Sequence, residues 1–197
     1  MDEQEQIEAA QRGSLGAYND LVRAYEQRVF NLCYRMLGDR ESAADATQEA
    51  FFSAYQALDR FRGGSFKAWL LRIATNACYD QLRRRQRRPV QSLDQMLTDE
   101  QHPFDPPSTD RTGDPEDRLL QLELSREIQQ ALNTLPEDQR LVIVLADIQG
   151  LSYEEISEVT RTSLGTVKSR ISRGRVKLRD SLLGRGELLR SKARPSP

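Results

Sequence analysis

Residues 151–183 read LSYEEISEVTRTSLGTVKSRISRGRVKLRDSLL, and they predict two helices that meet at a tight turn. Ser152 and Glu155 have the spacing of a capping box, in which each side chain bonds the other residue's backbone N–H. A short helix therefore opens at Tyr153. A few residues of turn follow, and Ser163 can cap a longer second helix. This pattern is typical of a helix-turn-helix, whose second helix enters the major groove of DNA.

The predicted second helix has two chemically different faces. Its apolar side chains fall on one side: Leu164, Val167, Ile171, Leu178 and Leu182. Hydroxyl and basic side chains fall on the other side: Thr166, Ser169, Arg170, Arg173 and Lys177. An arginine can bind guanine through two hydrogen bonds, and serine or threonine can reach bases or phosphates. We therefore predict a helix that is buried on one side and reads duplex DNA on the other. The alternative is a basic helix that is only solvated.

The segment before this motif is also predicted to be helical. Its run LVIVLA at 141–146 is rich in β-branched residues and could form a strand. Pro136 suits the first position of a helix and Gly150 suits its end, so a helix between them is favoured. A further helix is expected to begin at Asp114-Pro115.

The N-terminal part is predicted to be helical as well, because apolar residues recur at steps of three and four from 18 to 36. Ser14 can cap this helix and Gly38 can end it. In the next segment small side chains share one arc: Ala43, Ala46, Ala50, Ala54 and Leu58. The opposite arc mixes polar and aromatic side chains: Asp45, Gln48, Glu49, Phe52 and Tyr55. Such a mixture is typical of a partner surface, although another helix of the same domain could equally cover it.

A glycine-containing turn, RFRGGS at 60–65, leads into a helix that Ser65 can cap. We assign Trp69, in the apolar early part of this helix, to the core rather than to an exposed stacking platform. The end of the helix is strongly basic and carries five arginines without an acidic neighbour: Arg83, Arg84, Arg85, Arg87 and Arg88. Aromatic rings that stack on bases, close to arginines that neutralise phosphates, favour single-stranded nucleic acid as a ligand.

The net charge of −1 hides a segregated distribution of charge. Residues 93–118 contain two basic and eight acidic side chains, four prolines and few large apolar residues. Such a segment cannot bury enough surface to offset the entropy that is lost on ordering, so we predict a linker there. The segments on either side, 1–92 and 119–197, are each slightly basic.

The composition excludes several classes of function. With 30% charged residues and no apolar run near the roughly 18 residues that span a bilayer, the chain is not expected to insert into a membrane. Its acidic start lacks the features of a secretory signal, so we expect a cytoplasmic protein. His102 is the only histidine, and no catalytic triad or metal motif is present; we expect no catalytic residue, metal or cofactor. Cys33 and Cys78 are expected to be reduced core residues.

Three motifs, in this order, resemble the extracytoplasmic-function group of bacterial sigma factors: DATQEAFFSAYQAL at 45–58, DRFRGGSFKAWLLRIATNACYDQLRR at 59–84 and LSYEEISEVTRTSLGTVKSRISRGRVKLR at 151–179. The resemblance covers nearly the whole chain. It implies a subunit that binds core RNA polymerase, through its β′ clamp and β subunits, and directs initiation at promoters. It also implies a linker that threads the polymerase cleft and RNA exit channel. Whether an anti-sigma factor restrains the protein stays open.

The resemblance assigns roles to individual positions. The polar and aromatic arc from Asp45 to Tyr55 is implied to dock on the β′ clamp. A flipped-out base of the minus-ten element is implied to lie near a loop and to be contacted by Asn76. The loop residues are Phe61, Arg62, Gly63, Gly64 and Ser65. From the basic run we add Arg83 and Arg84 as contacts of the same unpaired DNA.

In the third motif the resemblance implies contacts to the minus-thirty-five element. The matched positions are Lys168, Ser169, Ser172 and Arg173. We add Thr166 and Arg170 from the polar face of the predicted helix. Ser172 stands where some relatives carry an aromatic residue, so the bases that those relatives recognise cannot be transferred to this chain.

We predict an all-α fold with two small helical domains joined by an extended acidic linker. The expected bounds are 1–92 for the first domain, 93–115 for the linker, 116–184 for the domain with the helix-turn-helix, and 185–197 for a basic tail. The expected partners are core RNA polymerase and promoter DNA, both duplex and single-stranded. The alternative function is a stand-alone helix-turn-helix regulator. A nucleic-acid enzyme such as a recombinase would need a catalytic constellation in the first domain, and the sequence shows none.

Overall fold

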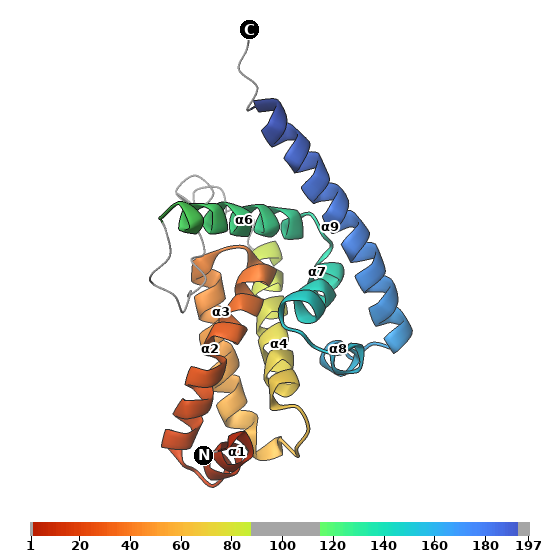
Figure 1. Cartoon of the computed structure of the whole chain (residues 1–197). Helices are drawn as coiled ribbons and strands as arrows, with labels where there is room; N and C mark the ends of the chain where they lie inside the picture. Colours follow the sequence, from red (N-terminus) through yellow and green to blue (C-terminus); the bar gives the residue numbers. More distant parts are fainter. Residues whose placement is uncertain (1, 88–114, 193–197) are drawn as a thin grey trace.

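The computed structural model describes residues 2–87 and 115–192, and every regular element in these ranges is a helix (Figure 1). The predicted all-α fold is thereby confirmed. The predicted linker lies outside the described residues except for Pro115, which begins a helix. In chain order the elements are α1 (Glu3–Gln11), α2 (Leu15–Leu37), α3 (Arg40–Ala57), η1 (Leu58–Arg60), α4 (Phe66–Arg87), α6 (Pro115–Asn133), α7 (Glu137–Ile143), η3 (Val144–Ile148), α8 (Tyr153–Thr160) and α9 (Leu164–Lys192).

Helices α2, α3 and α4 pack together and, with α1, form the N-terminal half (Figure 1). The small arc of α3 lies inside this bundle, where Ala43, Ala46, Ala50 and Ala54 are fully buried. Ser14 caps α2 by accepting a hydrogen bond from the Ala17 N–H (3.3 Å), and Gly38 ends it in a left-handed conformation, as predicted. Cys33 and Cys78 are buried free thiols in the same core, which also agrees with the prediction.

Helix α1 is an element that apolar periodicity does not predict. The Asp2 side chain accepts a hydrogen bond from the Glu5 N–H, and the Glu5 side chain accepts one from the Asp2 N–H (3.0 Å). These bonds form a capping box, and the Asp-x-x-Glu spacing at 2–5 is the signal that reveals it. At the other end of α1, Gln11 Nε2 donates to the Phe61 carbonyl (2.9 Å), so α1 supports the loop that precedes α4.

Helices α6, α7, α8 and α9 form the C-terminal half. Residues 141–146 are helical rather than extended, as predicted, because α7 continues through the π-helical turn η3 before Gly150 ends it at φ 65°. Helix α8 begins with the predicted capping box of Ser152 and Glu155. Helix α9 runs to Lys192, beyond its expected end at 183, since residues with high helix propensity follow and outweigh the glycines among them.

The two halves pack against each other, which the sequence does not predict. Arg140 Nη1 of α7 donates to the Met36 carbonyl at the end of α2 (2.7 Å). The Arg35 guanidinium of α2 donates to both the carbonyl and the hydroxyl of Ser125 in α6 (3.1 Å each). Helix α8 lies against α4, so the helix-turn-helix is placed beside the N-terminal bundle (Figure 1). No helix in 2–87 or 115–192 is long and apolar enough to cross a membrane.

Candidate polymerase and nucleic-acid interfaces

The polar and aromatic arc of α3 is open to solvent. Phe52 and Tyr55 are 58% and 42% exposed, and Asp45, Gln48 and Glu49 are exposed as well. The alternative that another helix of the domain covers this arc is therefore wrong. Exposed aromatic rings beside polar groups form a candidate docking surface for a protein partner.

Tyr55 is held in place on this surface by a second tyrosine. Its ring meets the Tyr18 ring edge-on, with centroids 4.9 Å apart. Tyr18 is buried and its hydroxyl donates to the Phe51 carbonyl. Burial raises the pKa of Tyr18 to about 12, so the phenol keeps its proton at neutral pH and can donate this bond. The exposed Tyr55 ring thus packs against the buried, uncharged side chain of Tyr18.

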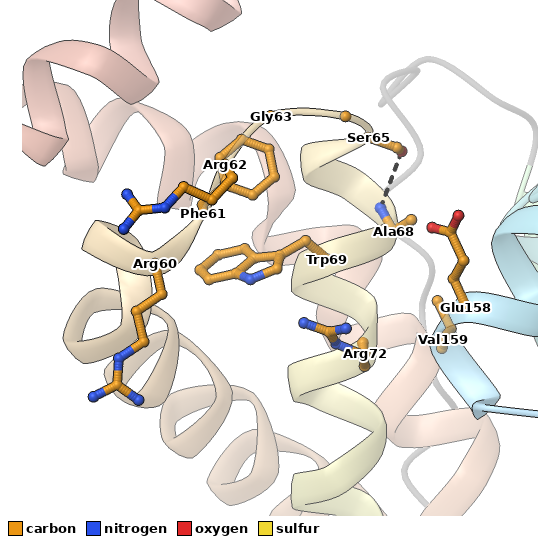
Figure 2. Close-up of a pocket in the computed structure, with 11 residues that line it drawn as sticks. Arg60, Phe61, Arg62, Gly63, Ser65, Ala68, Trp69, Arg72, Glu158 and Val159 are labelled. Carbon is orange, nitrogen blue, oxygen red and sulfur yellow. Dashed lines mark hydrogen bonds between the residues drawn. The ribbon is translucent and has the colours of Figure 1, made fainter.

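The loop between η1 and α4 borders a cavity of about 260 Å³, which we call the loop cavity (Figure 2). Gly63 and Gly64 have φ values of 98° and 88°, a conformation that favours glycine, and they turn the chain into α4. The Ser65 hydroxyl caps α4 by accepting a hydrogen bond from the Ala68 N–H (3.2 Å). All five predicted loop residues line this cavity.

One wall of the loop cavity is aromatic. Phe61 is only 6% exposed and packs against Phe66 and Trp69, with centroids 5.5 and 5.4 Å away. Its ring therefore shapes the wall and offers no free face for base stacking. Trp69, which the sequence places in the core, is half-buried and lines the cavity (Figure 2). Trp69 packs against the core, as predicted, and because the loop folds back over α4, part of its indole also lies at the cavity.

Three arginines line the loop cavity: Arg60, Arg62 and Arg72 (Figure 2). Of these, the sequence predicts only Arg62 as a site residue. Arg60 and Arg72 lie twelve positions apart in the chain, and only the turn between η1 and α4 brings them together. Three cations and an aromatic wall suit a nucleotide, whose base and phosphate need contacts of these two kinds.

Asn76 does not line the loop cavity. It is exposed on α4 and borders a second cavity of about 270 Å³, together with Thr75 and Tyr79 of α4. The far wall of this Asn76 cavity comes from α7 to α9 and includes Arg161 and Arg170. The loop and Asn76 therefore face two separate cavities along α4, and α8 contributes to both.

The basic end of α4 makes ion pairs that the sequence prediction lacks. Arg83 pairs with Asp80 one turn earlier (2.6 Å), and Arg85 pairs with Asp39 at the start of α3. The interpretation that this run has no acidic neighbour is wrong, because helix periodicity and the packing of α3 each supply one carboxylate. Of the other arginines in this basic run, Arg84 and Arg87 are exposed, and Arg88 lies outside the described residues.

The polar face of α9 presents most of the predicted DNA-reading side chains. Its exposed members are Lys168, Ser169, Ser172 and Arg173. Thr166 is half-buried. Arg173 lies back on Ser169, with Nε 3.2 Å from the carbonyl oxygen and Nη2 3.3 Å from the hydroxyl. Arg170 differs from the others, because its Nε lies 2.9 Å from the Asp138 carboxylate and its side chain borders the Asn76 cavity.

The apolar face of α9 is buried only in its central part, which includes Val167, Ile171 and Gly174. Leu164 and Leu182 are 39% and 36% exposed, so their predicted burial is wrong. Among the described residues, the neighbouring helices cover these two side chains only in part. Gly174 is a packing residue that the sequence does not single out, since a Cβ there would lie 2.9 Å from Ile143 Cγ1.

Two family models match the chain: Sigma-70 region 2 at residues 21–88 and Sigma-70 region 4 at residues 125–178. The chain is 41% identical to the ECF RNA polymerase sigma factor SigW of Bacillus subtilis over 179 residues, which cover 89% of this chain and 94% of that relative. The chain belongs to the extracytoplasmic-function (ECF) sigma factors. It is also 38% identical to the ECF RNA polymerase sigma factor SigE of Mycolicibacterium smegmatis, covering 87% of this chain and 63% of the length of that relative.

Solved structures have the fold of this ECF sigma factor. A chain of CnrH, solved in complex with the cytosolic domain of CnrY, matches with a TM-score of 0.65 and 26% identity over 93% of this chain and 99% of that one. The sigma factor RpoE from Bartonella quintana, solved with the anti-sigma factor NepR, matches with a TM-score of 0.64 and 28% identity over 84% and 96%. The resemblance to ECF sigma factors, which was inferred from the three sequence motifs, is thus confirmed.

Proposed function

We propose that this ECF sigma factor binds core RNA polymerase and reads promoter DNA in two places. The N-terminal half captures unpaired bases of the minus-ten element, and the C-terminal half holds the duplex of the minus-thirty-five element. The observation that carries the proposal is the match of region 2 and region 4 to two halves that each present a surface of the required chemistry.

The polymerase partner is assigned to the arc of α3. Its exposed Phe52 and Tyr55 supply apolar contact area, and Asp45, Gln48 and Glu49 supply polar contacts around them. We propose that this surface binds the β′ clamp and that the C-terminal half contacts the β subunit. An anti-sigma factor is a further partner, because the similar RpoE chain was solved with one.

DNA is assigned to three places. The loop cavity, with its three arginines, takes one flipped base and its phosphate, and Asn76 contacts the same unpaired strand. Arg83 and Arg84 approach the phosphates farther along α4. The exposed face of α9, with Thr166, enters the major groove of the duplex.

In this function the protein performs no covalent chemistry, because polymerase makes the transcript and the sigma factor contributes only binding energy. Neither the contact with the minus-ten element nor the contact with the minus-thirty-five element needs a cofactor or metal. The place of action is the cytoplasm, where polymerase and promoters are found.

In vitro transcription on a library of genomic fragments tests the proposal. We expect purified bacterial core RNA polymerase to start at defined sites only when the chain is added. The stand-alone regulator makes the opposite prediction, namely specific duplex binding by the chain alone that core polymerase leaves unchanged. That outcome, together with transcription that does not depend on the chain, would overturn the proposal.

A further inference from the structure

The turn between α8 and α9 contains a strained backbone position. Among the described residues, Arg161 is the only one other than a glycine with a positive φ, at φ 52° and ψ 43°. Helices commonly end in this left-handed conformation, but glycine usually provides it, because a Cβ there crowds the next carbonyl group. The chain itself uses glycine in this way at Gly38, after α2, and at Gly150, before α8. An arginine at the end of α8 therefore costs stability that a glycine would not cost.

Hydrogen bonds from neighbouring residues hold the turn in this conformation. The backbone N–H groups of Arg161 and Thr162 both donate to the Ser157 carbonyl. The Ser157 hydroxyl donates in return to the Thr162 carbonyl (2.5 Å), and the hydroxyls of Thr160 and Thr162 lie 2.8 Å apart. None of these bonds involves the side chain of Arg161. The turn therefore does not need an arginine in order to form.

The Arg161 side chain is exposed, and it makes no hydrogen bond or ion pair with the residues whose side chains the structure describes. Two other arginines of the same half differ in this respect. Arg170 pairs with Asp138 (2.9 Å), and Arg175 pairs with Asp147 (2.5 Å). Neither burial nor an ion pair with a described residue thus explains the arginine at position 161. Strained residues often belong to functional sites, where the strained conformation holds a group for a ligand.

The position of the turn indicates which ligand this cation would meet. Ser163 caps α9 by accepting a hydrogen bond from the Thr166 N–H (3.2 Å), so Arg161 comes two residues before the cap of the helix proposed to enter the major groove. In a helix-turn-helix, the first residues of the second helix contact base edges, and the first helix crosses the phosphate backbone. A cation in the turn between these helices is therefore placed beside the phosphates that border the groove.

We propose that Arg161 binds a phosphate of the minus-thirty-five duplex, and that the turn gives up stability for this contact. The inference rests on the proposed function, since it takes α9 as the element that reads this duplex. A phosphate contact fixes the position of the protein on the duplex but carries no sequence information. Arg161 thus strengthens binding to every sequence alike, in contrast to the base contact proposed for Arg173.

Three variants of the full chain separate the charge of Arg161 from its strain. Arg161→Gly removes both, whereas Arg161→Lys keeps both. Arg12→Gly is the matched control, because Arg12 is an exposed arginine at the end of α1, where φ is −80° and a glycine relieves no strain. Circular dichroism measures the melting temperature of each free chain. Fluorescence anisotropy measures binding of each holoenzyme, from about 50 to 200 mM KCl, to a promoter duplex that contains the minus-thirty-five element and ends before the minus-ten element.

Stability and binding are expected to change in opposite directions. Arg161→Gly should raise the melting temperature by about 2–4 °C, because glycine adopts the left-handed conformation without strain. The same variant should bind the duplex about three- to tenfold more weakly at low salt, and its slope of log K against log [KCl] should be smaller by about one. Arg161→Lys should keep the melting temperature and the salt slope, since an ammonium group also binds phosphate. Arg12→Gly should neither raise the melting temperature nor change the slope.

An unchanged salt slope in Arg161→Gly would overturn the phosphate contact and leave the proposed function intact. A melting temperature that does not rise would overturn the exchange of stability for binding. Equal losses of affinity in Arg161→Gly and Arg12→Gly would indicate a general effect of charge and would also count against the contact. A loss limited to one base pair, in a series of single-base variants of the duplex, would make Arg161 a base contact and contradict the inference. If the wild-type holoenzyme binds this duplex no better than an unrelated one, the proposed function is itself wrong and the inference falls with it.

Discussion

Gly174 shows how a single residue sets the distance between two helices. A Cβ at this position of α9 would lie 2.9 Å from Ile143 Cγ1 and 3.5 Å from the Gln139 carbonyl oxygen of α7. Ile143 is itself buried and β-branched, so it has few rotamers into which it can retreat. Helices α7 and α9 approach this closely because the residue between them has no side chain.

We expect Gly174→Ala to lower the free energy of unfolding by about 1–2 kcal/mol, because overpacking a filled core costs more than alanine gains in helix propensity. Gly184→Ala is the matched control, since it lies in the same helix and a Cβ there would meet nothing within 4 Å. It should leave stability unchanged or raise it by up to about 1 kcal/mol. Urea unfolding followed by circular dichroism measures both variants. A Gly174→Ala variant as stable as the parent would contradict the close approach of α7 and α9.

At the scale of the element, the ends of helices could be predicted because nearby side chains decide them. Ser14, Ser65, Ser152 and Ser163 each accept the expected hydrogen bond from a backbone N–H of the first turn. Burial of one arc of α3 could be predicted too, since periodicity alone decides it. Contacts between segments that lie far apart in the sequence could not be predicted. The pairing of Arg85 with Asp39 depends on how α4 crosses α3, and no local pattern contains that information.

The proposed docking surface of α3 lies opposite its buried alanines, so it can be changed without disturbing the core. We expect Asp45→Arg with Gln48→Ala to weaken binding to core RNA polymerase by about 1–3 kcal/mol, because the change removes polar contacts and reverses a charge at the interface. Native pull-down measures binding, and circular dichroism confirms folding. Glu26→Arg, an equal charge reversal on an exposed site of α2, is the control. Undiminished capture by the double variant would refute the docking surface.

Under the proposed function, α9 carries some side chains that read bases and others that bind phosphate. We expect Arg173→Ala to cost about 1–3 kcal/mol at the preferred upstream element and less at sequences changed in the contacted base pair, because a guanidinium can bind guanine with two hydrogen bonds. Lys168→Ala should weaken all sequences alike, since an ammonium group binds phosphate as a point charge. Binding of the holoenzyme to single-base promoter variants distinguishes the two. A uniform loss for Arg173→Ala would place that residue on the phosphates.

At the scale of the whole molecule, the two halves share one task in which duplex DNA is held at one end and opened at the other. The proposed function assigns Asn76 to the opening step; this residue is exposed on α4 and borders the cavity next to the loop cavity. Capturing an unpaired base stabilises the open state only when the duplex has first to be opened. Unstacking and unpairing a base cost a few kcal/mol, and capture contacts offset part of this cost.

We therefore expect Asn76→Ala to reduce open-complex formation on a fully paired promoter about tenfold more than on a template already mismatched at the start site. Permanganate footprinting of unpaired thymines, with the holoenzyme on both templates, measures the difference. Gln86→Ala is the matched control, because it removes an exposed amide from the same helix outside both cavities. The arginines near the end of α4 should behave differently, since attraction to phosphates acts on both templates and contributes to the salt dependence of each. Equal defects of Asn76→Ala on the two templates would show that this residue contributes to binding in general and not to the opening of the duplex.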